Sequence, residues 1–251
     1  MACTRRQLTA FLDDLLEPER FRDYCPNGLQ VEGREDINHL VTGVTASQAL
    51  IEAAIERGAD AILVHHGYFW RSEDPRIVGI KAKRIRSLIA HNVSLLAYHM
   101  PLDWHAELGN NATLARLMGI ADAQPLDPLN TNTPVFVGHL TTPSTLPQLA
   151  DVLHERLGRE PMVIGDQTVS SVAWCTGAGQ GFIGAAADWG ADVFVTGEVS
   201  EQTVHIARER DIGFIAAGHH ATERYGVKAV GERVAEALDL SHEFIDVANP
   251  A

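Results

Sequence analysis

The strongest constraint on the fold is an alternation of short apolar runs with helix-patterned segments along most of the 251-residue chain. Strands are expected at residues 39–44, 61–64, 93–98, 135–140, 161–164 and 172–175, and helices at 45–57, 80–90, 111–118 and 145–157. Thr45 and Gln48 fit a capping box at the start of the first of these helices. Strands that alternate with helices favour βαβ units. The sequence therefore predicts an α/β fold with mostly parallel sheets.

An internal repeat around the tripeptide Gly-Ala-Asp suggests how the chain is organised. Residues 58–60 and 190–192 each follow a helical pattern and precede an apolar strand. Each copy then continues through a further strand to a histidine and, four residues later, a carboxylate: His99 and Asp103 in the first copy, His219 and Glu223 in the second. Two matched segments in the same order favour duplication over chance convergence.

The duplication predicts two related α/β halves. Residues 121–134 are rich in Pro, Asn and Asp, which is typical of a connector. We therefore expect a first half at residues 1–125 and a second half at residues 126–251, intertwined as one compact unit.

Composition excludes several classes of protein. The chain has 20 Lys and Arg against 33 Asp and Glu, a formal net charge of -13, which argues against a nucleic-acid partner. Three cysteines without a CxxC pair exclude a disulfide scaffold and a cysteine zinc knuckle, and they fit a reducing cytoplasm. No targeting segment is visible, and no apolar run approaches the roughly 20 residues of a membrane span. We expect a cytoplasmic protein without a membrane partner.

Four polar clusters directly follow apolar strands. They are His65-His66, His99 with Asp103, Gly197-Glu198, and His219 with Glu223. In open α/β sheets the ligand crevice lies outside the carboxyl ends of the strands, so we expect these clusters at one rim. Pro101 disfavours helical geometry for the residue before it and indicates that His99 and Asp103 lie on a loop. His219 and Glu223 fit one face at the start of a helix.

Imidazoles and carboxylates favour Zn, Mn, Fe, Co or Ni over Ca or Mg. Adjacent residues on a strand point to opposite sides, so His65 and His66 are expected to serve one ion each rather than one ion together. Four imidazoles and two carboxylates match a two-metal site with open positions. For His65 and His66 alone, structural and metal-binding interpretations are equally open.

Two further motifs have simpler interpretations. The segment Thr176–Gly181 (TGAGQG) follows a strand, but it lacks the spacing of a dinucleotide fingerprint and the lysine of a P-loop, which favours a tight, closely packed turn over a phosphate cradle. Asn27 and Gly28 indicate a turn before an apolar run.

The chain resembles the Nif-three-like family, whose bacterial members carry the name GTP cyclohydrolase I type 2 homologue. The resemblance rests on stretches spread over nearly the whole chain: PNGLQVEG (26–33), VTGVTASQAL (41–50), GADAILVHHGYFW (58–70), YHMPLD (98–103), ELGNNA (107–112), AWCTGAGQ (173–180), TGEVSEQT (196–203) and AGHHATERYG (217–226). It implies two similar α/β halves, a ring-shaped homohexamer and a dinuclear metal centre. The implied ligands are His65, His66, Asp103, His219 and Glu223, with His99 beside or on the metals.

These observations lead to one leading hypothesis and one alternative. The leading hypothesis is a dinuclear divalent-metal-dependent hydrolase acting on a nucleotide-like substrate, because the family name implies opening of the GTP imidazole ring by water. One ion would be held by His66 and Asp103 and the other by His65 and His219, with Glu223 shared. His99, Glu198 and His220 are candidates for supporting the ligands or transferring protons. The alternative is a non-catalytic metal-binding, metal-delivery or scaffold protein.

Overall fold

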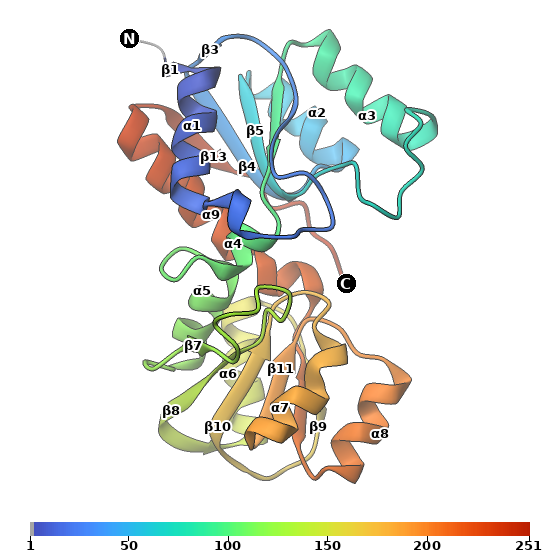
Figure 1. Cartoon of the computed structure of the whole chain (residues 1–251), viewed down its shortest axis with the longest axis vertical. Coiled ribbons are helices and arrows are strands. Elements are labelled where there is room, and N and C mark those ends of the chain that lie inside the picture. Colours follow the sequence, from blue (N-terminus) through green and yellow to red (C-terminus); the bar gives the residue numbers. More distant parts are fainter. Residues whose placement is uncertain (1–2) are drawn as a thin grey trace. The chain divides into compact units, whose positions relative to one another are not determined.

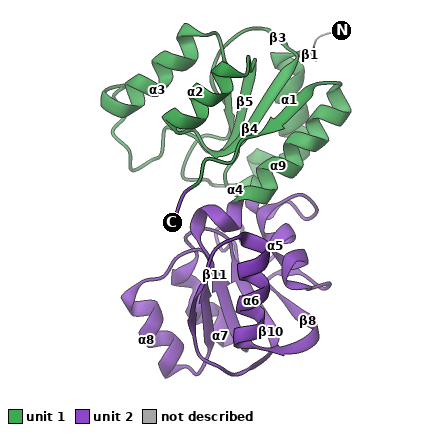
Figure 2. Cartoon of the chain, turned by 180° about the vertical axis from the view of Figure 1, so that it is seen from behind, with its two compact units in different colours: residues 1–102, 224–248 green, residues 103–223, 249–251 purple. Residues whose placement is uncertain are grey.

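The computed structural model describes residues 3–251 and has a mixed α/β architecture, as predicted (Figure 1). The chain divides into two compact units, coloured separately in Figure 2. Unit 1 contains the chain up to Leu102 together with Arg224–Ala248, and unit 2 contains Asp103–Glu223 with Asn249–Ala251. Both units thus draw on separate stretches of sequence. The assignment of residues 1–125 and 126–251 to two duplicated halves stays a prediction.

Unit 1 is built on a five-stranded sheet in the order β13-β4-β5-β6-β2. All neighbours in this sheet are parallel except β2 and β6. A short antiparallel pair, β1 and β3, completes the strands. The strands are β1 (Cys3–Thr4), β2 (Gly28–Val31), β3 (Asp36–Ile37), β4 (His39–Thr45), β5 (Ala61–His66), β6 (Ser94–Ala97) and β13 (Ser241–Phe244).

Helices cover both faces of this sheet. They are α1 (Arg5–Leu16), the 3₁₀ turn η1 (Pro18–Arg20), α2 (Gln48–Glu56), α3 (Gly79–Ala90) and the unit 1 part of α9 (His219–Leu238). Figures 1 and 2 show α2 and α3 on one face and α1 and α9 on the other. Ile62 and Val64 of β5 share one core cluster with Leu50 of α2 and Leu88 of α3. A strand buried on both faces explains the uninterrupted apolar run before His65.

Unit 2 contains a six-stranded sheet in the order β7-β8-β10-β11-β12-β9. Its centre, β10-β11-β12, is parallel, and the outer strands pair antiparallel. The strands are β7 (Gln124–Pro125), β8 (Phe136–Thr145), β9 (Met162–Ile164), β10 (Thr168–Cys175), β11 (Val193–Thr196) and β12 (Gly213–Ala216). The helical segments are α5 (Asn110–Met118), α6 (Leu146–Leu157), η2 (Gln180–Phe182), α7 (Ile183–Trp189) and α8 (Glu201–Glu209).

The core of unit 2 also lies on both sides of its sheet. Figure 1 shows α7 in front of the sheet and α6 behind it. On the α7 side, Phe194 and Phe214 pack with Ile183 and Ala186 in one cluster. Trp174 of β10 is fully buried, and its indole N–H donates to the carbonyl of Asn111 at 3.0 Å. Within residues 3–251, no helix combines the length and the apolarity that crossing a membrane requires.

The aspartates of the two Gly-Ala-Asp tripeptides make matching contacts. Oδ2 of Asp60 accepts hydrogen bonds from the backbone N–H groups of Asn38 (2.8 Å) and His39 (3.0 Å) at the start of β4. Oδ2 of Asp192 accepts them from Ser170 and Ser171 in β10, both at 2.8 Å. Each carboxylate is therefore hydrogen-bonded to the start of the strand parallel to the one it precedes. This contact explains why an aspartate occurs at the same place in both copies of the repeat.

Alanine at Asp60 or Asp192 is expected to lower the free energy of unfolding by about 2 kcal/mol, because each change leaves two backbone donors without their acceptor. Urea unfolding would measure the change. Asp188→Ala is the matched control, since this exposed carboxylate only pairs with Arg210 at 2.7 Å and such pairs contribute about 0–1 kcal/mol. Equal stability of the Asp192→Ala and Asp188→Ala proteins would contradict the role given to Asp192.

The contribution of Asp192 to the free energy of unfolding depends on pH. Burial alone raises the pKa of this carboxyl, but the N–H groups of Ser171 and Ser170 outweigh burial and hold the pKa below its ordinary value. The stabilisation is therefore present above the unfolded pKa of about 3.9 and is lost as the pH falls through the folded-state pKa. The stability difference between wild type and Asp192→Ala is expected to shrink in acid.

Two local predictions are wrong. Helix α2 begins after Ser47, whose side chain accepts from the N–H of Leu50, whereas Thr45 ends β4. His99 lies in the loop between β6 and the next helix, as expected, but Asp103 does not, because Met100–Trp104 forms the short helix α4. Pro101 is the second residue of that helix, where its missing N–H would have no helical partner in any case.

Candidate metal centre

Three histidines of unit 1 lie close together at the ends of two neighbouring parallel strands. His65 and His66 are the last residues of β5, and His99 follows β6 after one further residue. The ring centroid of His65 lies 4.5 Å from that of His66 and 5.0 Å from that of His99. One ring nitrogen from each of the three lies within 4.8 Å of the others. The expectation that His65 and His66 diverge is therefore wrong, because both rings turn toward one region as β5 ends.

Each of these histidines has its Nδ1 atom hydrogen-bonded to oxygen. Nδ1 of His65 donates to the carbonyl of Tyr98 at 3.1 Å, and Nδ1 of His99 donates to Oδ1 of Asp23 at 2.7 Å. Nδ1 of His66 lies 3.1 Å from the hydroxyl of Thr45. A carbonyl or carboxylate oxygen can only accept, so the neutral rings of His65 and His99 carry their proton on Nδ1 and have Nε2 as the basic atom. Metal-binding histidines in proteins are commonly fixed in this way.

In unit 2, His219 lies between two carboxylates. Its Nδ1 donates to Oε1 of Glu198 at 2.7 Å, and its Nε2 lies 3.1 Å from Oε2 of Glu223, four residues along α9. Burial lowers the pKa of His219, but Glu223 and Glu198 outweigh burial and raise the pKa to about 9. The side chain of Glu223 is only 4% exposed. At neutral pH the protonated ring of His219 therefore balances these two carboxylates, a role that a divalent cation can take over.

Asp103 is the second buried carboxylate of unit 2. Its Oδ1 accepts from the hydroxyl of Thr176 at 3.1 Å and from the side-chain amide of Asn110 at 2.9 Å. Burial, followed by the charges of Asp103 and Glu223, raises the pKa of the neighbouring Cys175 thiol well above its ordinary value. The carboxylates of Asp103 and Glu223 thus concentrate negative charge near Cys175, and burial together with this charge keeps its thiol neutral.

Gly177 connects the glycine-rich turn to these ligands. Its φ is +64°, and a Cβ atom built there would lie 2.0 Å from Oε1 of Glu223 and 3.1 Å from Nε2 of His219. Its N–H donates to the hydroxyl of Thr222 at 3.0 Å, and its carbonyl accepts from the N–H of Gly197 at 2.9 Å. The turn therefore packs against the carboxylate without room for a side chain.

A hydrogen-bonded turn after β5 places an aromatic side chain beside the histidines. Phe69 has φ of +67°, a conformation that costs a bulky residue of order 1–3 kcal/mol. Oε2 of Glu73 accepts from the N–H groups of Phe69 (2.9 Å) and Trp70 (3.3 Å), which holds this turn. The Trp70 ring then lies edge-on to His99, with centroids 5.0 Å apart.

The predicted site residues fall into two sets. Unit 1 brings together His65, His66 and His99, and unit 2 brings Glu198, His219 and Glu223 together beside the turn that also holds Asp103. His220 is buried, and its N–H donates to the carbonyl of Ala251 at 3.2 Å.

Sequence reasoning missed four residues that support these side chains, namely Asp23, Asn27, Thr45 and Thr176. Asp23 and Asn27 contact His99, Thr45 contacts His66, and Thr176 contacts Asp103. Asn27, Thr45 and Thr176 lie in motifs that the sequence analysis interpreted as a turn, a helix cap and a glycine-rich turn, and none of these motifs predicted a contact with a candidate ligand.

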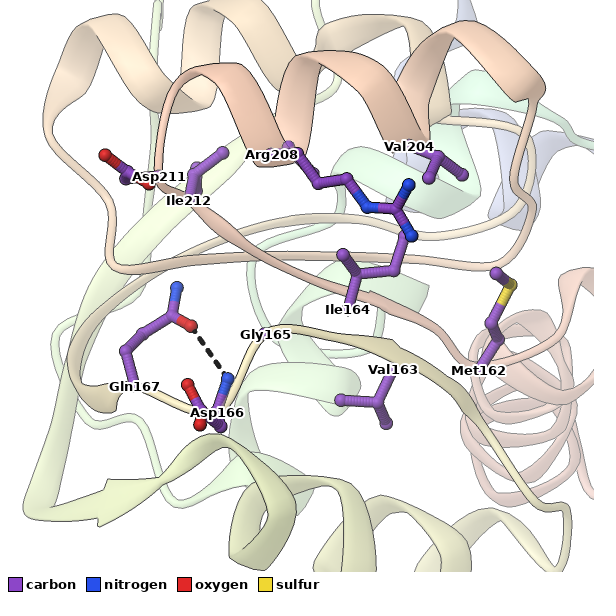
Figure 3. Close-up of a pocket in the computed structure, with 11 residues that line it drawn as sticks. Met162, Val163, Ile164, Gly165, Asp166, Gln167, Val204, Arg208, Asp211 and Ile212 are labelled. Atoms are coloured by element: carbon purple, nitrogen blue, oxygen red, sulfur yellow. Dashed lines mark hydrogen bonds between the residues drawn. The ribbon is translucent and has the colours of Figure 1, made fainter.

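Unit 2 also contains a groove of about 620 Å³ between β9 and α8 (Figure 3). Its lining mixes apolar and polar groups, and Arg208, Asp166 and Asp211 supply its charges. It contains none of the candidate ligands. The imidazole and carboxylate groups described above are donors of the kind that bind transition-metal ions.

Comparison with known proteins identifies the family. The family model for Duf34/NIF3 (NGG1p interacting factor 3) matches residues 3–250, and the chain belongs to this family. A Pseudomonas aeruginosa relative named "GTP cyclohydrolase 1 type 2 homolog" is 51% identical over 252 residues, covering 100% of both chains. An Escherichia coli K12 relative of the same name is 51% identical over 248 residues, covering 98% of each chain.

Solved structures share the fold. The protein ybgI, described as of unknown function, has a TM-score of 0.94 at 50% identity, covering 99% of this chain and 100% of that one. TTHA1606 from Thermus thermophilus has a TM-score of 0.91 at 35% identity with the same coverage. Reduced HcgD from Methanocaldococcus jannaschii is 22% identical with a TM-score of 0.83 and covers 99% of each chain, which shows the fold alone.

Proposed function

We propose that this protein is a dinuclear divalent-metal-dependent hydrolase that acts on a nucleotide-like substrate. The observation that carries the proposal is the fixed orientation of the histidines: His65, His66, His99 and His219 each have Nδ1 within hydrogen-bond distance of an oxygen atom. In His65 and His99 the acceptor on Nδ1 leaves Nε2 as the basic atom, which supports a role for these rings as metal ligands.

The proposed ligand set is the one that the family resemblance implies. His66 and Asp103 would hold one ion, His65 and His219 the other, and Glu223 would be shared. When bound, divalent ions of the Zn, Mn, Fe, Co or Ni type would polarise the substrate and make a water molecule acidic enough to attack near neutral pH.

The remaining residues have supporting roles in this proposal. Glu198 holds Nδ1 of His219 and thereby directs Nε2 toward Glu223. Thr176 and Asn110 donate to Asp103 and fix the direction of its carboxylate. His99 and His220 are the candidates for moving a proton to or from the substrate.

Three further parts of the proposal concern substrate, assembly and compartment. The name shared by the relatives supports a guanine nucleotide or a similar heterocycle as the substrate. We extend the proposal to a homohexameric assembly, on the family resemblance. The described cysteines, Cys3, Cys25 and Cys175, are free thiols and buried, which supports a reducing compartment such as the cytoplasm.

The test is metal reconstitution followed by a turnover assay. Protein loaded separately with each candidate ion is expected to release formate from GTP, and Asp103→Ala is expected to abolish this release, because that variant removes a ligand and leaves Thr176 and Asn110 without their acceptor. Hydrolysis of a different nucleotide bond would keep the hydrolase and change the substrate. Metal binding with a wild-type rate no higher than that of Asp103→Ala would instead support a metal-binding or delivery protein.

A further inference from the structure

We propose that Asp23 is a positioning residue that fixes the imidazole of His99 with its proton on Nδ1 and its basic Nε2 atom available to the cluster formed with His65 and His66. The use of that nitrogen at a metal site rests on the proposed function, whereas the position of the proton does not.

Asp23 is buried, and both of its carboxylate oxygens are fixed by hydrogen bonds. The residue is 6% exposed. Its Oδ1 accepts from Nδ1 of His99 at 2.7 Å and from the N–H of Tyr24 at 2.6 Å. Its Oδ2 accepts from the N–H of Met100 at 2.8 Å and from the amide of Asn27 at 3.0 Å. Four donors fix both carboxylate oxygens, so the carboxylate cannot rotate away from the ring.

The backbone of His99 is held by the same segment. Its N–H donates to Oδ1 of Asn27 at 2.7 Å, and Asn27 in turn donates to Asp23. The edge of the Trp70 ring packs against the imidazole, with centroids 5.0 Å apart. Both the main chain and the ring of His99 are therefore set by residues far from it in sequence. Such second contacts determine which nitrogen of a histidine is basic.

The internal repeat supplies an independent argument. His219 occupies the place of His99 in the second copy, and its Nδ1 is also bonded to a carboxylate, that of Glu198. Glu198 follows its Gly-Ala-Asp by six residues, and the residue at that place in the first copy is His66. The first copy thus has a histidine where the second has the supporting carboxylate, and Asp23, from outside the repeat, supplies the same contact. The same pairing reached from two different segments indicates that it matters to the site.

A different use of the same atoms is a metal site formed by Asp23, Cys25 and His99, whose donor atoms lie within 4.8 Å of one another. The 2.7 Å contact between Asp23 and Nδ1 of His99 is a hydrogen-bond distance, too short to enclose an ion between the two atoms. Cys25 is a buried free thiol, and the proposal assigns it no role. We therefore assign Asp23 to orientation, and Cys25→Ser separates the two interpretations.

The experiment reads the protonation of His99 directly in metal-free protein. Histidine labelled with ¹⁵N and long-range ¹H–¹⁵N correlation spectra distinguish Nδ1–H from Nε2–H rings, and His99→Gln identifies the His99 signals. Wild type and Cys25→Ser are expected to show the Nδ1–H form. Asp23→Asn is expected to shift His99 toward Nε2–H, because an amide N–H can donate to Nδ1. Asp13→Asn, which alters another carboxylate of unit 1 that accepts from Tyr98 at 2.6 Å, is expected to leave His99 unchanged.

Zinc titration of the same proteins supplies the second measurement. Asp23→Asn is expected to weaken binding by about 10- to 100-fold, and Asp13→Asn to leave it at the wild-type value. An Nε2–H ring in wild type would overturn the proposal even if Asp23→Asn failed to fold. A change of His99 in Cys25→Ser equal to that in Asp23→Asn would overturn it in favour of the three-residue metal site. Zinc binding absent from wild type would refute the proposed metal centre, while an Nδ1–H ring in that protein would still uphold the role of Asp23.

Discussion

Replacing Glu223 with alanine is expected to remove both metal ions, whereas replacing His66 is expected to remove one. Reconstituted wild-type protein should hold about two ions per chain, because the proposed site binds two metal ions. The difference follows from the proposed sharing of one carboxylate between two ions. The loss of Glu223 would also leave His219 without its buried counter-charge, because the second carboxylate, Glu198, is 41% exposed. Elemental analysis after gel filtration would count the ions.

The control for this prediction lies on the same helix. Glu236→Ala changes an exposed carboxylate of α9 and is expected to keep both ions. Equal losses in the Glu223→Ala and His66→Ala proteins would argue against a shared ligand. A wild-type count of one ion or none after reconstitution with Zn, Mn, Fe, Co and Ni would reject the dinuclear centre itself.

Gly177→Ala is the second change for which we expect a large effect, although no side chain of the donor set is altered. The new Cβ atom would lie 2.0 Å from Oε1 of Glu223. The backbone of Gly177 cannot shift easily, because its N–H is hydrogen-bonded to the Thr222 hydroxyl and its carbonyl to the N–H of Gly197. The carboxylate must move instead, and metal affinity is expected to fall by about 10- to 100-fold, as when the orientation of a ligand is lost.

The fold is expected to survive this change. A left-handed conformation costs a residue with a side chain roughly 1–2 kcal/mol, which is a fraction of the stability of a domain. Gly181→Ala is the matched control in the same turn, since a Cβ atom there meets no atom within 4 Å. Zinc titration of both variants measures the effect on metal affinity, and thermal unfolding measures the effect on stability. Normal zinc affinity in Gly177→Ala would show that Glu223 does not bind the metal through the oxygen beside this glycine.

The elements that sequence predicted well are those governed by short-range periodicity. The apolar runs before His65 and before His99 are buried parallel strands, and His219 begins a helix on which Glu223 lies one turn later. The mixed α/β class and the family follow from such local signals spread over the whole chain. Gly177 also fits the tight, closely packed turn that its segment predicted.

The errors share a physical cause, which is that a local pattern does not reveal the tertiary partner of a side chain. Thr45 has the sequence of a helix cap, but its hydroxyl lies against His66, and Ser47 caps the helix instead. Pro101 disfavours a helical conformation of the residue before it, yet Met100 begins α4 with its side chain buried. Asp23 is separated from His99 by 76 residues, so no spacing rule connects them.

The buried thiols carry a consequence for the survival of this protein in the presence of peroxide. Burial and the charge of Asp23 raise the pKa of Cys25 to about 12, and Cys175 is held in the same neutral form by burial and two carboxylates. Oxidation of cysteine begins from the thiolate, which is the nucleophile. Peroxide is therefore expected to react slowly with Cys25 and Cys175 while the protein is folded, and rapidly only after unfolding exposes them.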